Sequence, residues 1–187
     1  MPLHVFETFD EWFAAQVWSG REQLAADHLL SRGYEVFLPR YREYRRWSDR
    51  VKTTERALFP GYLFVHMGRD VLGKVLTAPG VVRIVGDGQR PLAIHTAEID
   101  AVKRIVESGL NAEPWPFARV GDHVRIAVGP LRDTEGVVIR VKNSHRLVVS
   151  ISLLQRSVAV ELDAQWLTAG IGVSASAAYA VAAGMSQ

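Results

Sequence analysis

The stretch that decides the fold is Leu58-Phe59-Pro60-Gly61-Tyr62-Leu63-Phe64-Val65. Its Pro-Gly pair is a strong turn signal, and the residues after that pair form an unbroken apolar run. A continuous apolar run is typical of a strand that is buried on both faces. We therefore expect a strand in the middle of a sheet, entered through a tight turn.

The residues around this strand predict alternating strands and helices. Before it, we expect a strand over 12–18, a helix that starts at a capping box formed by Ser19 and Glu22 and ends at Gly33, and a strand over 34–38. After it, we expect helices over 70–77 and 96–107 on either side of a strand over 81–85. The order is strand, helix, strand, strand, helix, strand, which indicates an α+β domain over residues 1–110.

Residues 40–57 interrupt this pattern with a strongly basic segment. It holds seven basic and three acidic residues, with aromatic residues between them and almost no apolar run. Such a composition is typical of a solvated arm or hairpin. We expect this arm to project from the first domain.

The second half of the chain has a different composition. Residues 111–118 carry two prolines and no periodicity, and we expect a linker there. Short β-rich runs over 122–128, 135–142, 146–153 and 157–162 then predict a small barrel, within a domain over 119–168. In so small a barrel a Cβ at Gly136 would collide with a neighbouring strand. Residues 169–187 are almost all small, and we expect them to be without structure.

Composition limits the classes of protein that fit. The 187 residues include 22 Lys and Arg against 20 Asp and Glu, so contact with nucleic acid must be local rather than spread over a polybasic body. No apolar stretch is long enough for a membrane-spanning helix, and the acidic start does not suit a signal peptide. Cysteine is absent, which excludes disulfides and thiolate chemistry. We expect a soluble, cytoplasmic, monomeric protein.

Motifs in both halves carry a resemblance to one family. They are Trp12-Phe13, Phe59–Val65 and Pro79–Gly86 in the first half, and Val120–Arg125, Gly129–Leu131 and Gly136–Val138 in the second. In this order they resemble the NusG family of bacterial transcription elongation factors. The resemblance covers about Glu11 to Thr168. It implies a ferredoxin-like α+β domain, called NGN, followed by a KOW domain, a small SH3-like β-barrel.

The resemblance implies a binding site for RNA polymerase on the NGN domain. In the family this domain binds the clamp helices of the largest polymerase subunit in an apolar concavity. By motif match the site falls on Trp12, Phe59, Pro60, Gly61 and Tyr62. The alternative interpretation is that these aromatic residues belong to the core.

The basic arm and the start of the first helix are expected to lie near nucleic acid. Guanidinium groups bind phosphates, and aromatic residues between them can stack on unpaired bases. The arm residues expected near the non-template DNA strand or a nearby duplex are Arg42, Arg45, Arg46, Trp47 and Arg50. For Arg21 and Gln23 the expectation comes from the resemblance, because relatives that read a DNA element place polar contacts at these positions. The alternative is a charged, solvated hairpin that has no partner.

A turn of the KOW domain is expected to bind a second partner. In the family this turn binds a small-subunit ribosomal protein, also called NusE, and in housekeeping members the termination factor Rho. The matching residues are Leu154, Gln155 and Arg156, where housekeeping members have Phe followed by Gly-Arg. Leu131 likewise replaces a phenylalanine. These two departures put Rho binding in doubt and indicate a specialised antitermination paralogue.

The pattern of polar residues does not suit an enzyme. The six histidines are scattered, without the spacing of metal ligands or of paired general acids and bases. We expect no catalytic residue, no metal and no cofactor. Two other functions stay open: a housekeeping factor that acts with Rho, and a ribosome-associated RNA-binding KOW protein.

Overall fold

The computed structural model describes residues 10–46, 51–117, 122–141, 144–163, 166 and 171–172. The chain divides into two compact units. The first consists of Met1–Ile99 with Ser152–Leu154, and the second of Asp100–Ile151 with Gln155–Gln187. The division falls inside the last helix, α3 (Thr96–Glu107).

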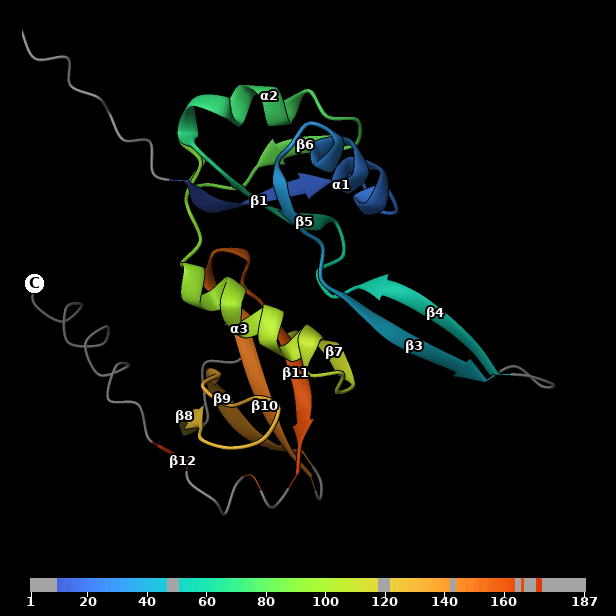
Figure 1. The fold of residues 1–187 in the computed structure, drawn as a ribbon, viewed down its shortest axis with the longest axis vertical. Coiled ribbons are helices and arrows are strands. Elements are labelled where there is room, and N and C mark those ends of the chain that lie inside the picture. The colour runs from blue at the N-terminus through green and yellow to red at the C-terminus, as the bar shows by residue number, and fades with distance from the viewer. Residues whose placement is uncertain are drawn as a thin grey trace, which may run out of the picture. The chain divides into compact units, whose positions relative to one another are not determined.

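The first unit holds a four-stranded antiparallel sheet in the order β2-β5-β1-β6 (Figure 1). Its elements are, in chain order, β1 (Glu11–Val17), α1 (Glu22–Ser31), β2 (Glu35–Phe37), β3 (Arg40–Arg46), β4 (Val51–Ala57), β5 (Tyr62–Met67), the 3-10 helix η1 (Arg69–Val71), α2 (Leu72–Leu76), β6 (Val81–Ile84) and the start of α3. In the sheet, β5 lies between β2 and β1, which is the split βαβ arrangement of a ferredoxin-like fold. The predicted mid-sheet position of the strand after Pro60-Gly61 is confirmed.

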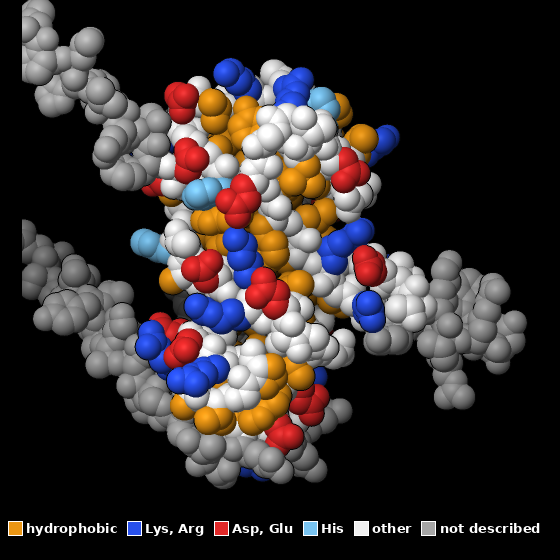
Figure 2. Space-filling view, viewed as in Figure 1, with side chains coloured by type: hydrophobic (Ala, Val, Ile, Leu, Met, Phe, Trp, Pro, Cys, Tyr) orange, Lys and Arg blue, Asp and Glu red, His pale blue; other side chains and the backbone are white. Residues whose placement is uncertain are grey.

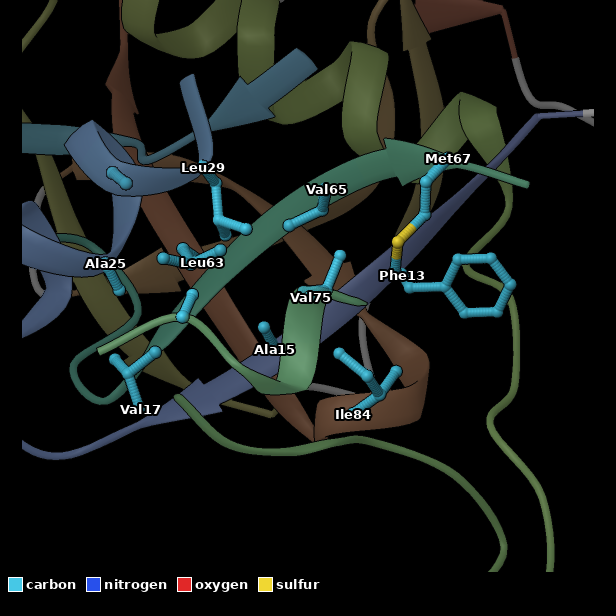
Figure 3. Close-up of a cluster of buried hydrophobic side chains, with 12 residues drawn as sticks. Phe13, Ala15, Val17, Ala25, Leu29, Leu63, Val65, Met67, Val75 and Ile84 are labelled. Carbon is cyan, nitrogen blue, oxygen red and sulfur yellow. The ribbon is translucent and has the colours of Figure 1, made fainter. Parts of the chain in front are cut away.

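One face of this sheet carries the hydrophobic core of the first unit, which Figure 3 shows in close-up. Successive side chains of a strand point to opposite faces, so every second residue of β1 and β5 reaches this side. The two strands contribute Phe13, Ala15, Val17, Leu63, Val65 and Met67. Helix α1 covers them with Ala25, Ala26 and Leu29, and α2 adds Val75. Helix α1 then ends at the predicted place, where Gly33 N donates to Leu30 O and Tyr34 N donates to Leu29 O, the pattern of a Schellman motif.

The predicted capping box at the start of α1 is wrong. The helix begins at Glu22 with Arg21 as its N-cap residue, and no side chain caps it. Ser19 lies instead two residues before the N-cap, in a turn closed by the hydrogen bond from Arg21 N to Trp18 O (2.9 Å). The Glu22 carboxylate accepts a hydrogen bond from a distant segment, the backbone N–H of Gly61 (2.9 Å).

The basic arm forms a two-stranded antiparallel hairpin of β3 and β4. A hydrogen bond from Leu58 N to Pro39 O (2.9 Å) closes its base. Two of its arginines pair with acidic residues of the arm, Arg56 with Glu43 at 2.6 Å and Arg40 with Glu55 at 3.6 Å. The hairpin predicted from composition is therefore present.

The second unit is built on an antiparallel sheet in the order β12-β8-β9-β10-β11-β7. Its strands are β7 (Ala112–Pro116), β8 (Asp122–Ile126), β9 (Glu135–Val141), β10 (Ser144–Ile151), β11 (Arg156–Leu162) and β12 (Ile171–Gly172). The 3-10 helix η2 (Ser152–Leu154) follows β10 in the chain and is the segment that the division assigns to the first unit. The four predicted strands correspond to β8 to β11. Helix α3, which precedes the sheet, has the predicted periodicity, because Ile99, Val102 and Ile105 are all fully buried.

Two strands lie where the sequence predicts none. The expected linker forms β7, which pairs with β11 at the edge of the sheet. Because an edge strand uses the hydrogen-bonding groups of one side only, it tolerates Pro114 and Pro116, which lack an N–H group. The expected unstructured tail contributes β12, whose Ile171 lies opposite Ile126 of β8. The rest of that tail lies outside the described residues.

Gly136 of β9 lies where two strands approach closely, as predicted. A Cβ built on it would lie 2.6 Å from Val148 O and 2.9 Å from a methyl carbon of Leu147. Atoms do not pack at such distances, and the backbone oxygen cannot move aside without disturbing the ladder between β9 and β10. A side chain at this position must therefore displace a strand.

We predict that Gly136→Ala destabilises the barrel by about 1–3 kcal/mol, the usual cost of forcing a methyl group into a packed site. Urea denaturation of the full chain measures this. Gly73→Ala is the matched control, because a Cβ at Gly73 meets nothing within 4 Å and the residue lies in α2. The control should be neutral or stabilising by up to about 1 kcal/mol, since alanine is the better helix former. Equal effects of the two substitutions would contradict the prediction.

Candidate functional site

The turn Phe59-Pro60-Gly61-Tyr62 is fixed by three hydrogen bonds. Tyr62 N donates to Phe59 O (3.0 Å) and closes the turn. Gly61 has φ = +81°, the left-handed conformation that a glycine at the third position of a type II turn adopts. Its carbonyl accepts from Val17 N (2.8 Å), and its N–H donates to Glu22 Oε1 (2.9 Å). Both backbone polar groups of Gly61 are therefore bound to the end of β1 and the start of α1.

An aromatic layer covers the face of the sheet opposite the core. Trp12 lies opposite His66 in the register of β1 and β5, with their ring centroids 5.0 Å apart. Phe64 of β5 meets Phe37 at 6.1 Å and Phe59 edge-to-face at 5.4 Å. The first contact joins β1 to β5, and the other two join β5 to β2 and to the first residue of the turn.

The five residues predicted to contact RNA polymerase differ in their exposure. Trp12 and Phe59 are 3% and 1% exposed, which fits the alternative interpretation of core aromatic residues. Gly61 and Tyr62 are half-buried, and Pro60 is exposed. At the turn itself Pro60 is therefore exposed and Tyr62 half-buried, while Phe59 packs inward against Phe64 and Trp12 lies further along the ladder, opposite His66.

The connection between β1 and α1 lies directly beside this turn. Arg21 and Gln23, predicted to lie near nucleic acid, are both exposed, and Gln23 Nε2 donates to Asp27 Oδ1 (2.7 Å). Sequence reasoning missed Trp18, whose side chain is 68% exposed. The expected strand over 12–18 included Trp18, whereas β1 ends at Val17; its place immediately before Ser19-Gly20 was the signal that could have found it.

The arm residues predicted to lie near nucleic acid are only partly described. Arg42 is exposed on β3. The register places Arg45 opposite Lys52 and Arg46 opposite Val51, at the end of the hairpin away from its base. Trp47 and Arg50 lie outside the described residues. The ion pairs of the arm lie nearer its base, so the acidic partners Glu43 and Glu55 are not opposite Arg45.

The predicted partner-binding turn of the second half joins η2 to β11. Leu154 is half-buried at the end of η2, while Gln155 and Arg156 are exposed. Gln155 has φ = +50°, so it makes the sharp reversal between the two elements. Leu131, the other departure from the family pattern, is fully buried in the barrel core.

Charged side chains of both signs are mixed on the surface. Figure 2 shows basic and acidic side chains interspersed on the visible face, with apolar side chains between them. Among the described residues, no group of three or more His, Asp or Glu side chains could hold a metal ion. Within the same ranges, no helix is long and apolar enough to cross a membrane. Away from the predicted site residues, the backbone N–H groups of Arg90 and Gln89 donate hydrogen bonds to the Asp87 carboxylate. These bonds lower the pKa of that carboxyl group below its usual value of 3.8.

Comparison with known proteins gives consistent matches. The family model described as "Transcription termination factor nusG" matches residues 10–103. The transcription termination/antitermination protein NusG of Escherichia coli K12 is 30% identical over 166 residues, which is 81% of this chain and 92% of that protein. The corresponding protein of Helicobacter pylori 26695 is 29% identical over 166 residues, which is 81% of this chain and 94% of that protein.

A solved structure has the same fold. The structure described as "Domain interaction in Thermotoga maritima NusG" superposes with a TM-score of 0.52 at 22% identity, covering 84% of this chain and 95% of that one. The α+β fold class, with an NGN domain followed by a KOW barrel, is thereby confirmed. The matched model, the relatives at about 30% identity and this fold agree, and the chain belongs to the NusG family of transcription termination/antitermination factors, which are not enzymes.

Proposed function

We propose that this protein is a transcription elongation and antitermination factor that binds the clamp helices of bacterial RNA polymerase through its NGN domain. The observation that carries the proposal is the turn Phe59–Tyr62, which three hydrogen bonds hold beside an aromatic sheet face, with Pro60 exposed and Tyr62 half-buried. An apolar turn of fixed shape beside packed aromatic residues is a surface on which the apolar side of a partner helix can dock. We place the protein in the cytoplasm, where transcription takes place.

Binding of this kind would act on polymerase by shifting a conformational equilibrium. A factor that has higher affinity for the closed clamp raises the population of that state, and only the difference in affinity counts. A closed clamp disfavours the open states that accompany pausing. A few kcal/mol of differential affinity is sufficient, and no chemical step is needed.

The arm is proposed to lie near the non-template DNA strand. Arg42 is exposed on β3, and its guanidinium group can bind a phosphate. Exposed Trp18 and Arg21 provide a second place where an aromatic ring and a guanidinium group lie close in the chain, a combination that suits unpaired bases.

The KOW domain is proposed to recruit a second partner, for which the ribosomal protein NusE fits best. Exposed Gln155 and Arg156 beside half-buried Leu154 retain the apolar-plus-arginine character of the family turn. Because Leu131 is fully buried, its departure from phenylalanine concerns packing rather than a partner. We propose a specialised paralogue that does not activate Rho, and Leu154-Gln155-Arg156 is then the one departure from the housekeeping pattern that supports it. The housekeeping factor that acts with Rho is the second candidate.

A ribosome-associated RNA-binding protein is a third candidate, and the burial of Trp12 and Phe59 is the observation that favours it. Such a protein should bind RNA in the absence of polymerase with a steep dependence on salt. The near-balanced charge of this chain, 22 basic against 20 acidic residues, supports weak RNA binding instead. An RNA titration at two salt concentrations separates the RNA-binding ribosomal protein from the polymerase-binding elongation factor.

We predict that Tyr62→Ala weakens binding to a fragment containing the polymerase clamp helices by about 30-fold, the effect of removing a central interface residue. Titration of the fragment with the full chain measures the affinity. Tyr62 is the better probe, because Phe59→Ala would remove a buried ring and cost about 3–5 kcal/mol of stability.

The control for this experiment is Leu76→Ala, which removes apolar surface that is 46% exposed on α2. Its affinity for the clamp helices should equal that of the wild type. Circular dichroism must show that each variant is folded. Absence of binding by the folded wild type would refute the polymerase proposal and leave the ribosomal candidate.

We predict that replacing Arg42, Arg45, Arg46 and Arg50 together by glutamine weakens binding to a complete elongation complex but not to the isolated clamp helices. The logarithmic salt slope should fall by about one for each phosphate that the variant no longer neutralises. The control replaces Arg125 and Arg132, exposed arginines of the barrel half, in the same way. Equal loss of affinity for the DNA-free fragment would show that the arm does not act through nucleic acid.

A further inference from the structure

The carboxylate of Glu22 joins two segments that are far apart in the sequence. Its Oε1 lies 2.9 Å from Gly61 N, in a partly buried position 39 residues away along the chain. Glu22 is the first residue of α1, and Gly61 is the glycine of the proposed polymerase-binding turn. The contact is therefore a direct link between that turn and the helix.

The N–H that Glu22 binds belongs to the peptide between Pro60 and Gly61. A four-residue turn with proline second and glycine third can form as type I or type II, and the two forms differ mainly in the orientation of this peptide. In type II the glycine has positive φ, as Gly61 does at +81°. Rotation of the peptide to the type I orientation would point its N–H away from Glu22, so the hydrogen bond selects the type II form.

The neighbouring contacts do not select that orientation by themselves. The bond from Tyr62 N to Phe59 O closes both turn types. The bond from Val17 N to Gly61 O holds the next peptide, between Gly61 and Tyr62. A Cβ at Gly61 would lie 3.6 Å from Val17 O, which is ordinary contact, so the positive φ rather than a lack of space is what favours glycine at this position. Of the three hydrogen bonds that fix the turn, the one with Glu22 holds the central peptide.

We propose that Glu22 is a positioning residue for partner binding: it selects the orientation of the Pro60–Gly61 peptide and so sets Pro60 and Tyr62 for the polymerase. The proposal rests on the proposed function for its partner, but not for the contact itself. Arg21 and Gln23 flank Glu22 in the chain, and Trp18 lies at the start of the turn that leads into the helix. Glu22 therefore also ties the protein-binding turn to the residues proposed to lie near DNA.

The test compares Glu22→Ala with Glu22→Gln in the full chain. Glutamine keeps an oxygen that can accept the hydrogen bond from Gly61, whereas alanine removes it. Glu107→Ala, at the exposed last residue of α3, controls for the loss of one negative charge. Two quantities are measured: the exchange rate of the Gly61 amide proton by NMR, and the affinity for the clamp-helix fragment.

We expect Glu22→Ala to accelerate exchange of the Gly61 amide and to weaken clamp-helix binding, each by about tenfold, as for loss of a hydrogen bond to a charged acceptor. Glu22→Gln should restore most of both properties. Glu107→Ala should change neither. Rescue by glutamine separates positioning from a general loss of stability, because both variants lose the same charge at the helix start.

Three results would overturn the proposal. The first is wild-type affinity in Glu22→Ala. The second is equal weakening of binding in Glu22→Ala and Glu22→Gln with unchanged Gly61 exchange, which would mean that the carboxylate contacts the partner directly. The third is an unchanged exchange rate of the Gly61 amide in Glu22→Ala, whatever the affinity for the clamp helices. If the wild type does not bind the clamp helices, the polymerase function fails, and the exchange measurement still decides whether Glu22 holds the turn.

Discussion

The antiparallel pairing of β1 with β5 is the constraint on which the first unit depends. Its register runs from Glu11 opposite Met67 to Gln16 opposite Tyr62. Alternation along these two strands gives the sheet an aliphatic face under α1 and an aromatic face on the other side. A shift by one residue would exchange the two faces, so neither layer could form in another register.

The same ladder determines where the proposed binding turn lies. Because the pairing ends at Gln16 and Tyr62, the turn before β5 meets the connection that leaves β1. Val17 and Glu22 then lie within hydrogen-bonding distance of Gly61. The corner proposed to bind a partner thus arises where the central ladder stops.

Features with a local cause could be predicted from the sequence. The apolar run after Pro60-Gly61 predicted the central strand, and the close approach at Gly136 followed from the small size of the barrel. Long-range features could not be predicted: the Glu22 carboxylate has the spacing of a capping box, but its partner lies 39 residues away. The strand β7 was not predicted because it contains two prolines, which a strand accepts only at the edge of a sheet. The burial of Trp12 and Phe59 beside half-buried Tyr62 likewise depends on tertiary packing.

A turn held by hydrogen bonds suits the proposed function, which depends on binding. Association costs conformational freedom, and a loop that is already fixed in its bound form loses less of it. Here two hydrogen bonds hold Gly61 before any partner arrives, and the aromatic residues behind the turn are already packed. With only two more basic than acidic residues in the chain, long-range attraction to nucleic acid contributes little. On the proposed function, affinity must then come from preformed local surfaces such as the turn at Gly61, where both backbone polar groups of the glycine are already hydrogen-bonded.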